Sequence, residues 1–163
     1  MMNVDYRAVE IGNVIPVTTA TTYVAGRCVQ LVSGSTQSAT SVVLASVRVF
    51  GLVKENYISG VIDECNLGGK GIYGAGRISV LCQGIATVQQ VVYSGVSYSV
   101  YDQAQTYNCN DDIYATPATG VLTNQSQTGM GPNGITSLRV GRVITPPTSA
   151  GNGTPMQITV ECA

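Results

Sequence analysis

Short runs of Val, Ile, Leu and Thr, separated by Gly, Pro, Ser and Asn, occupy most of this chain. β-branched residues favour extended backbone, whereas Gly, Pro, Ser and Asn favour turns. We find no convincing helix. Many short strands joined by such turns are typical of an antiparallel barrel or sandwich. We therefore predict an all-β fold, a single small β-barrel or β-sandwich domain with long loops rich in Gly, Ser and Pro.

The apolar runs give the expected strands, at residues 14–18, 27–32, 42–53, 77–88, 91–93, 97–101, 138–144 and 156–162. Gly84 predicts a bulge or bend inside the longest of them, and Ser94-Gly95 predicts a turn. Loops are expected at residues 56–76, 102–110, 120–133 and 146–154, with 120–133 a mobile loop. Apolar residues fall on both faces of residues 27–32, so we expect strands covered on both sides, by a barrel interior or by a neighbouring subunit.

With 163 residues, of which 44% are hydrophobic, the chain suits one domain with an aliphatic core. Residues 1–13 carry no strand pattern. They would form either a frayed terminus or an arm that adds a strand to a neighbour's sheet edge, and we favour the arm. The expected organisation is thus an N-terminal arm, 1–13, followed by the β-domain, 14–163.

The chain contains no histidine, and only 8 basic and 9 acidic residues. Histidine is the side chain best suited to proton transfer near neutral pH and is the commonest metal ligand. Catalytic triads and histidine-ligated metals are therefore excluded, and we expect neither enzymatic activity nor a cofactor. The net charge of −1 favours association, and the basic residues form no cluster for nucleic acid. We also expect no membrane span and no secretory leader.

Three motifs have both a structural and a chemical interpretation. The five cysteines lack a C-x-x-C pair, and Cys28, Cys82 and Cys162 lie in apolar runs; buried free thiols are favoured over disulfides or reactive groups. Gly69–Gly74 matches G-x-G-x-x-G but follows no strand and precedes no helix, so a glycine loop is favoured over a dinucleotide site. Asn108–Asp112 is interpreted as a polar turn, with adventitious divalent-ion binding as the alternative.

The tyrosines gather in one third of the chain and could line a sheet face or form a contact surface. No periodicity decides between the two. Together with the arm they supply the candidate capsid or subunit contacts, which are Tyr6, Arg7, Val9, Tyr93, Tyr98, Tyr101, Tyr107 and Tyr114.

Several stretches, in order, resemble the head decoration (capsid cement or stabilisation) proteins of tailed bacteriophages. They are Val14-Ile-Pro-Val, Ala25-Gly-Arg-Cys-Val-Gln-Leu-Val, Val49-Phe-Gly-Leu-Val, Val80-Leu-Cys-Gln-Gly-Ile-Ala-Thr-Val, Gly95-Val-Ser-Tyr-Ser-Val-Tyr-Asp, Gly141-Arg-Val-Ile and Met156-Gln-Ile-Thr-Val. The resemblance spans residues 14–160. It implies a small barrel-like domain that binds the outside of a preformed icosahedral shell, often as trimers, and it implies no catalytic residues.

From this resemblance we expect a structural virion protein that bridges neighbouring copies of the major capsid protein. It would be made in the host cytoplasm and would reside on the outer surface of the capsid as a homo-oligomer. Two alternatives stay open. One is a tail, baseplate or fibre-associated β-domain, although the chain shows no fibre-like repeat. The other is a carbohydrate-binding β-sandwich with the tyrosines as a stacking platform, although such platforms favour Trp, which is absent.

Overall fold

A computed structural model describes residues 11–16, 22–33, 40–45, 48–58, 61–63, 77–131 and 133–162. Within these ranges the chain forms strands and turns, and the one helical segment is a short 3-10 turn, η1 (Ala150–Asn152). The predicted all-β class is therefore confirmed.

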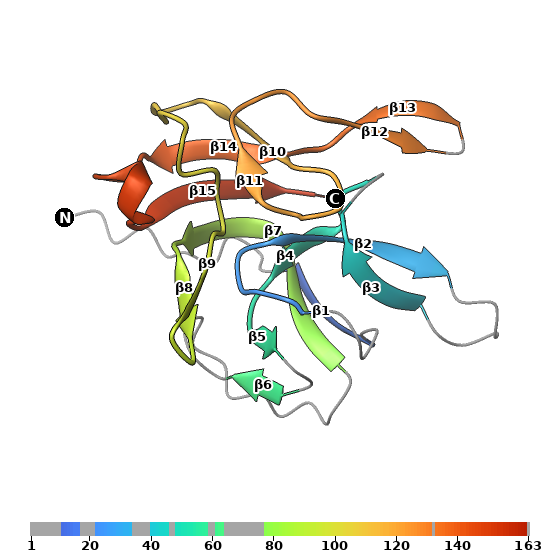
Figure 1. Ribbon diagram of the computed structural model, residues 1–163. Coiled ribbons are helices and arrows are strands. Elements are labelled where there is room, and N and C mark those ends of the chain that lie inside the picture. The colour runs from blue at the N-terminus through green and yellow to red at the C-terminus, as the bar shows by residue number, and fades with distance from the viewer. Residues whose placement is uncertain are drawn as a thin grey trace.

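Most strands join one large, nearly closed, barrel-like sheet (Figure 1). Its nine members are β1 (Ile11–Pro16), β2 (Cys28–Ser33), β3 (Thr40–Leu44), β4 (Gly51–Val53), β7 (Arg77–Val88), β10 (Asp112–Ala115), β11 (Leu122–Thr123), β14 (Arg139–Thr145) and β15 (Met156–Glu161). Eight of them follow the order β11-β10-β14-β15-β7-β4-β2-β3. The ninth, β1, lies outside this order and pairs with β7.

The two ends of this order are drawn together by the turn between β10 and β11. The Cys28 amide donates to the Gly120 carbonyl at 2.7 Å, and the Ala118 amide donates to the Ala45 carbonyl at 2.9 Å. Gly120 has a φ of 66°, and a Cβ there would lie 2.2 Å from the Cys28 oxygen. The closure of the sheet therefore requires glycine at this position.

Strand β7 matches the predicted 77–88 run and is the centre of the sheet. It pairs with β1 and β4 along its first half and with β15 from Gln83 onward. The bulge or bend predicted at Gly84 is found instead at Cys82, where the register against β1 shifts: Ile11 pairs with Gln83, and Gly12 pairs with Leu81. The pairing with β15 continues through Gly84 without a shift.

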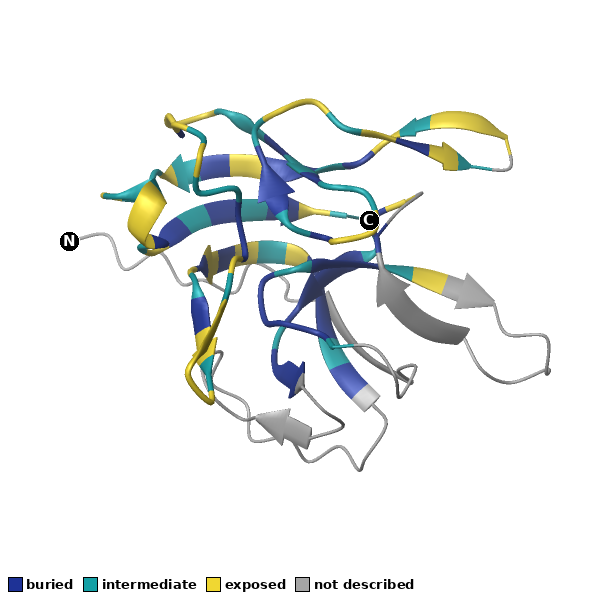
Figure 2. Ribbon diagram, viewed as in Figure 1, coloured by how far each residue is buried: buried dark blue, intermediate teal, exposed yellow. Residues whose placement is uncertain are grey.

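The buried side chains form two clusters, one on each face of the sheet where β2, β4 and β7 meet. Consecutive residues divide between them: Cys28 belongs to the larger cluster and Val29 to the smaller. Tyr23 and Tyr57, with ring centroids 6.1 Å apart, complete the smaller cluster. Buried residues are concentrated where these strands meet (Figure 2), so the predicted cover on both sides holds at the start of β2, whereas Leu31, further along β2, is exposed.

Three hairpins complete the fold. They are β5 (Asn56–Ile58) with β6 (Val61–Asp63), β8 (Val91–Tyr93) with β9 (Val96–Tyr98), and β12 (Thr128–Gly131) with β13 (Gly134–Ser137). The predicted Ser94-Gly95 turn is confirmed, with φ of 49° and 77°. Two successive positive φ values are those of a type I′ turn, whose twist suits a tight hairpin.

Three expectations were wrong. Residues 42–53 do not form one strand, because β3 and β4 pair with opposite edges of β2. The expected loop at 56–76 contains the β5–β6 hairpin, and the expected mobile loop at 120–133 contains β11 and β12. Their Gly, Ser, Thr and Asn residues favour turns locally, but strand pairing with nearby residues overrides that preference: β5 pairs with β6, β11 with β10 and β12 with β13.

The first strand also begins earlier than the sequence indicated. Strand β1 begins at Ile11, so residues 11–13 belong to the sheet and not to the arm that was predicted to end at residue 13.

Candidate contact surface

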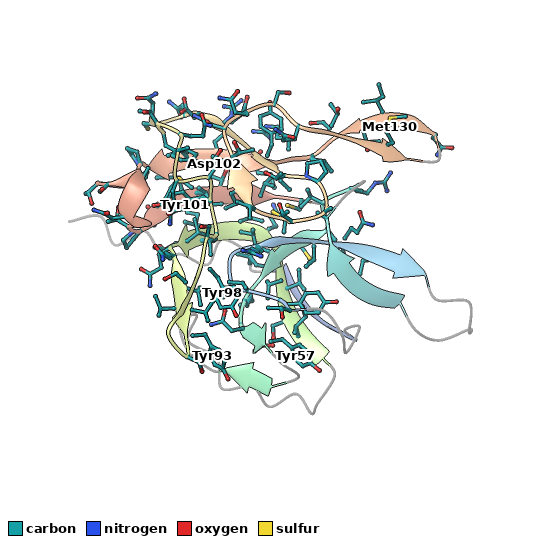
Figure 3. The ribbon with its side chains drawn as sticks, viewed as in Figure 1. Tyr57, Tyr93, Tyr98, Tyr101, Asp102 and Met130 are labelled. Atoms are coloured by element: carbon teal, nitrogen blue, oxygen red, sulfur yellow. The ribbon has the colours of Figure 1, made fainter. Side chains whose placement is uncertain are left out.

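The β12–β13 hairpin extends away from the main sheet and exposes two large apolar side chains (Figures 1 and 3). Met130 is 74% exposed and Ile135 is 70% exposed. The two residues pair directly across the hairpin, so their side chains share one face. This apolar pair is the most exposed among the residues that the structure describes.

The hairpin also lacks the charges that commonly protect exposed strands from association. No charged residue occurs between Ile113 and Leu138. Among the described strands, β12 and β13 pair only with each other. An uncharged hairpin with an exposed apolar pair has the properties of a surface that docks on another protein.

The β8–β9 hairpin exposes two further apolar side chains, one on each of its faces. Val92 is 66% exposed and Val96 is 52% exposed; Val92 pairs with Ser97 and Val96 pairs with Tyr93, so the two valines point to opposite faces. Val91 is buried in the larger core cluster and anchors the hairpin to the sheet. The surrounding sequence is again uncharged, from Ile78 to Tyr101. Met130 lies on the β12–β13 hairpin, well separated in the view from Tyr93 and Tyr98 on β8 and β9 (Figure 3).

The tyrosines predicted as contacts do not form a single surface. Tyr101 and Tyr107 are buried, and their rings make an edge-to-face contact with centroids 5.5 Å apart. The Tyr101 hydroxyl donates to the Thr154 carbonyl at 2.6 Å, and the Tyr107 hydroxyl donates to the Asp102 carbonyl at 2.9 Å. As expected for buried phenols, desolvation raises the pKa of both groups. The prediction that Tyr101 and Tyr107 are contact residues is therefore wrong, because both belong to the core of the domain.

The remaining predicted contacts divide into two groups. Tyr93, Tyr98 and Tyr114 are half-buried on β8, β9 and β10, so each keeps part of its ring at the surface. The arm residues Tyr6, Arg7 and Val9 lie outside the described residues.

An ion cluster that the sequence analysis did not identify lies across β10, β14 and β15. Arg139 Nε lies 2.9 Å from Asp112 Oδ1, and Arg139 Nη1 lies 2.7 Å from Glu161 Oε2. Arg142 Nε approaches the same Asp112 oxygen at 3.2 Å. Hydrogen bonds from Arg139 lower the pKa of both carboxyl groups, and the two carboxylates raise the pKa of Arg139.

A β-bulge makes this cluster possible. Residues three apart on a regular strand point to opposite faces, so Arg139 and Arg142 could not both reach Asp112. Ile113 pairs with Gly141 and Tyr114 pairs with Arg139, which leaves Val140 without a partner on β10. The extra residue returns both guanidinium groups to one face of the sheet.

The cysteines behave largely as predicted. Cys28, Cys82, Cys109 and Cys162 are free thiols, with Cys28 and Cys82 buried, Cys162 half-buried and Cys109 exposed. Burial raises the pKa of Cys28 well above its usual range and raises the pKa of Cys162 to about 12. Thiols this hard to ionise are poor nucleophiles and poor metal ligands. Cys65 and the Gly69–Gly74 motif lie outside the described residues.

The Asn108–Asp112 segment forms the predicted polar turn. Asp111 Oδ2 accepts from the Asn108 amide at 2.8 Å and from Asn124 Nδ2 at 3.1 Å, while Asp112 faces the two arginines. The adjacent carboxylates therefore serve different neighbours. No group of three or more His, Cys, Asp or Glu residues in the described part of the chain is placed to hold a metal ion.

The exposed apolar pair did have a signal in the sequence. Met130-Gly-Pro-Asn-Gly-Ile135 places Pro-Asn-Gly, a turn-forming sequence, between two apolar residues. The polar, glycine-rich composition on either side favoured a loop.

No known protein-family model, curated protein or solved structure matches this chain. Among the described residues, no helix has the length and apolar character needed to cross a bilayer.

Proposed function

We propose that this protein is a structural virion component that binds the outside of a tailed-phage capsid and stabilises it by bridging neighbouring capsomers. The observation that carries the proposal is the apolar pair Met130 and Ile135, which is exposed on one face of an uncharged hairpin. Such a hairpin supplies apolar contact area to a protein surface. The resemblance of residues 14–160 to capsid cement proteins is the reason for proposing that the protein surface on which the hairpin docks is the capsid.

The physical demands of a decorated shell agree with these features. Many copies act together, so each copy needs only a modest affinity. Apolar contacts are less sensitive to salt than ion pairs, whose attraction is screened within about 8–10 Å at ordinary ionic strength. Two uncharged hairpins with exposed apolar side chains allow one molecule to contact two neighbours, which is what a bridge or a closed homo-oligomer such as a trimer requires.

The test is co-sedimentation of the purified protein with undecorated heads. We expect saturable binding by the wild-type protein, with little loss between low and high salt. The double variant Met130→Ser/Ile135→Ser should fall to background, because it removes the apolar pair while leaving the core intact. Leu31→Ser, which removes a partly exposed apolar side chain from β2, is the matched control and should bind like the wild type.

Two results would contradict the proposal. The first is wild-type protein that pellets no more with heads than without them. The second is label found on tails alone in negative-stain images of virions, which would favour the tail or baseplate alternative. A carbohydrate-binding role is less well supported, because Tyr101 and Tyr107 are buried and cannot contribute to a sugar platform.

A further inference from the structure

Arg27 differs from the other arginines whose side chains the structure describes. Arg139 and Arg142 contact carboxylates, and Arg48 is exposed to water. Arg27 is half-buried at the start of β2, and it makes no ion pair with any of the described residues. Its Nε donates instead to the Ser99 carbonyl at 3.0 Å, just beyond β9. That hydrogen bond fixes the guanidinium group and leaves its terminal nitrogens available.

In this environment a bound anion would stabilise the guanidinium group of Arg27. Partial burial removes water from the guanidinium group and lowers the pKa of Arg27, and the nearby Tyr98 side chain is the one group that opposes this shift. A charge withdrawn from water is costly unless a counter-charge compensates for it. A carboxylate would fit, because it accepts two parallel hydrogen bonds from one guanidinium group. Tyr98, the residue before Ser99, also influences Arg27, and its hydroxyl group is a further hydrogen-bond donor in this neighbourhood.

The surroundings indicate that the carboxylate belongs to a protein. Arg27 and Tyr98 lie at the base of the β8–β9 hairpin, which exposes Val92 and Val96. Arg and Tyr anchors beside apolar side chains are the composition of interface hot spots. A nucleic acid would instead require several clustered cations, and residues 78–101 contain none.

We propose that Arg27 and Tyr98 together receive an Asp or Glu side chain from the protein surface on which the β8–β9 hairpin docks. The inference rests on the proposed function only in taking that surface to be the capsid shell. The apolar hairpin supplies contact area, and the Arg27–Tyr98 pair supplies register, because only one orientation of the partner brings its carboxylate to the guanidinium group.

The first test compares head binding by wild-type protein, Arg27→Gln, Arg27→Lys and Arg48→Gln. Losing a charge-assisted, bidentate contact should raise the Kd of Arg27→Gln about tenfold to a hundredfold. Arg27→Lys should recover only part of the affinity, because lysine keeps the charge but not the planar fork. Arg48→Gln removes an exposed guanidinium group and should bind like the wild type. Tyr98→Phe removes one hydroxyl group and covers the case in which Arg27→Gln does not fold; it should weaken binding several-fold.

The outcomes separate this inference from the proposed function. If wild-type protein binds heads and Arg27→Gln binds equally well, the inference is overturned and the proposed function stands. If wild-type protein does not bind heads, the proposed function fails, and a titration with blocked glutamate decides the inference. In that titration the Arg27 Nε–Hε resonance should shift saturably with N-acetyl-glutamate methylamide and not with the glutamine analogue. No shift, or an equal shift at Arg48, would overturn it.

Discussion

The nine-stranded sheet and the β12–β13 hairpin use the same aliphatic residues in opposite ways. In the sheet, Ile158 on β15 is fully buried, and its neighbours on β7 and β14 pair with both of its edges. In the hairpin, Ile135 has one strand partner and is 70% exposed. An isolated two-stranded hairpin is only marginally stable in water, so apolar residues on it contribute little to folding. Their position is therefore not explained by the stability of the domain, which agrees with the contact with another molecule that we propose.

The β8–β9 hairpin is intermediate between these two regions. Val91 fixes it to the larger core cluster, whereas Val92, the next residue, faces away from that cluster and is exposed. Alternation along one strand therefore gives the domain a core contact and a surface contact in consecutive residues. The comparison teaches that exposure in this molecule follows from which face of a strand the rest of the domain covers and not from residue type.

The sharpest test of this difference is the same substitution in both regions. Ile158→Ala should destabilise the protein by about 2–5 kcal/mol, because it leaves a cavity in a closely packed core. Ile135→Ala should change the free energy of unfolding by no more than about 0.5 kcal/mol, since its side chain is already in water. Chemical denaturation of both variants measures the two values. Equal losses would show that the hairpin packs against the domain in solution.

A second test concerns closure of the sheet. Gly120→Ala places a methyl group against the Cys28 carbonyl at a positive φ, and should cost about 2–4 kcal/mol from steric overlap and backbone strain combined. Gly95 also has a positive φ, but a Cβ there meets no atom within 4 Å. Gly95→Ala should therefore cost only the backbone term, about 1 kcal/mol. If thermal unfolding gave the two variants the same loss, the β10–β11 turn would not close the sheet.

Tyrosine hydroxyl groups provide a third, smaller difference. Tyr101→Phe removes the donor to the Thr154 carbonyl and should destabilise the domain by about 1 kcal/mol. Tyr93, on the β8–β9 hairpin, makes no hydrogen bond through its side chain among the described residues, and Tyr93→Phe should leave stability unchanged. Equilibrium unfolding in urea would measure both. A loss at Tyr93 as large as that at Tyr101 would remove the distinction between core and hairpin tyrosines.

The smallest effect is expected from the ion cluster on β10, β14 and β15. Exposed ion pairs contribute little, so Arg139→Gln should lower the Tm by no more than a few degrees at pH 7. The pKa values of Asp112 and Glu161 are lowered in the folded protein, so their stabilisation is present above their unfolded pKa values and is lost as the pH falls below about 4. The Tm difference between variant and wild type should therefore shrink as the pH falls below about 4 and vanish once the pH is below the lowered pKa values of the folded protein. A difference that persisted there would point to packing by the Arg139 side chain and not to its charge.

Much of the strand content could be predicted because it depends on local composition. The 77–88 run, with its β-branched residues, predicted β7 to the residue, and Ser94-Gly95 predicted its hairpin turn. The burial of Cys28 and Cys82 followed equally from their apolar neighbours. In each case the nearest residues along the chain carry the information.

The candidate site was less predictable because it depends on partners far away in sequence. Tyr93 and Tyr101 each follow a valine and precede a polar residue. The ring of Tyr101 nevertheless packs against Tyr107 in the core, whereas Tyr93 reaches the surface. The ion cluster needed a bulge at Val140, which becomes visible only once the register of β10 against β14 is known.

By itself, the sequence determined the chemical repertoire and the class of fold: a histidine-free, charge-poor, β-branched chain can build sheets and apolar contacts but not the usual acid–base sites. Tertiary structure alone decided which of its apolar residues are covered. Burial is set by the number of strands that pack around a residue, and that number depends on pairings between distant segments. Met130 and Ile135 remain exposed because β12 and β13, in the described part of the chain, have only each other as partners.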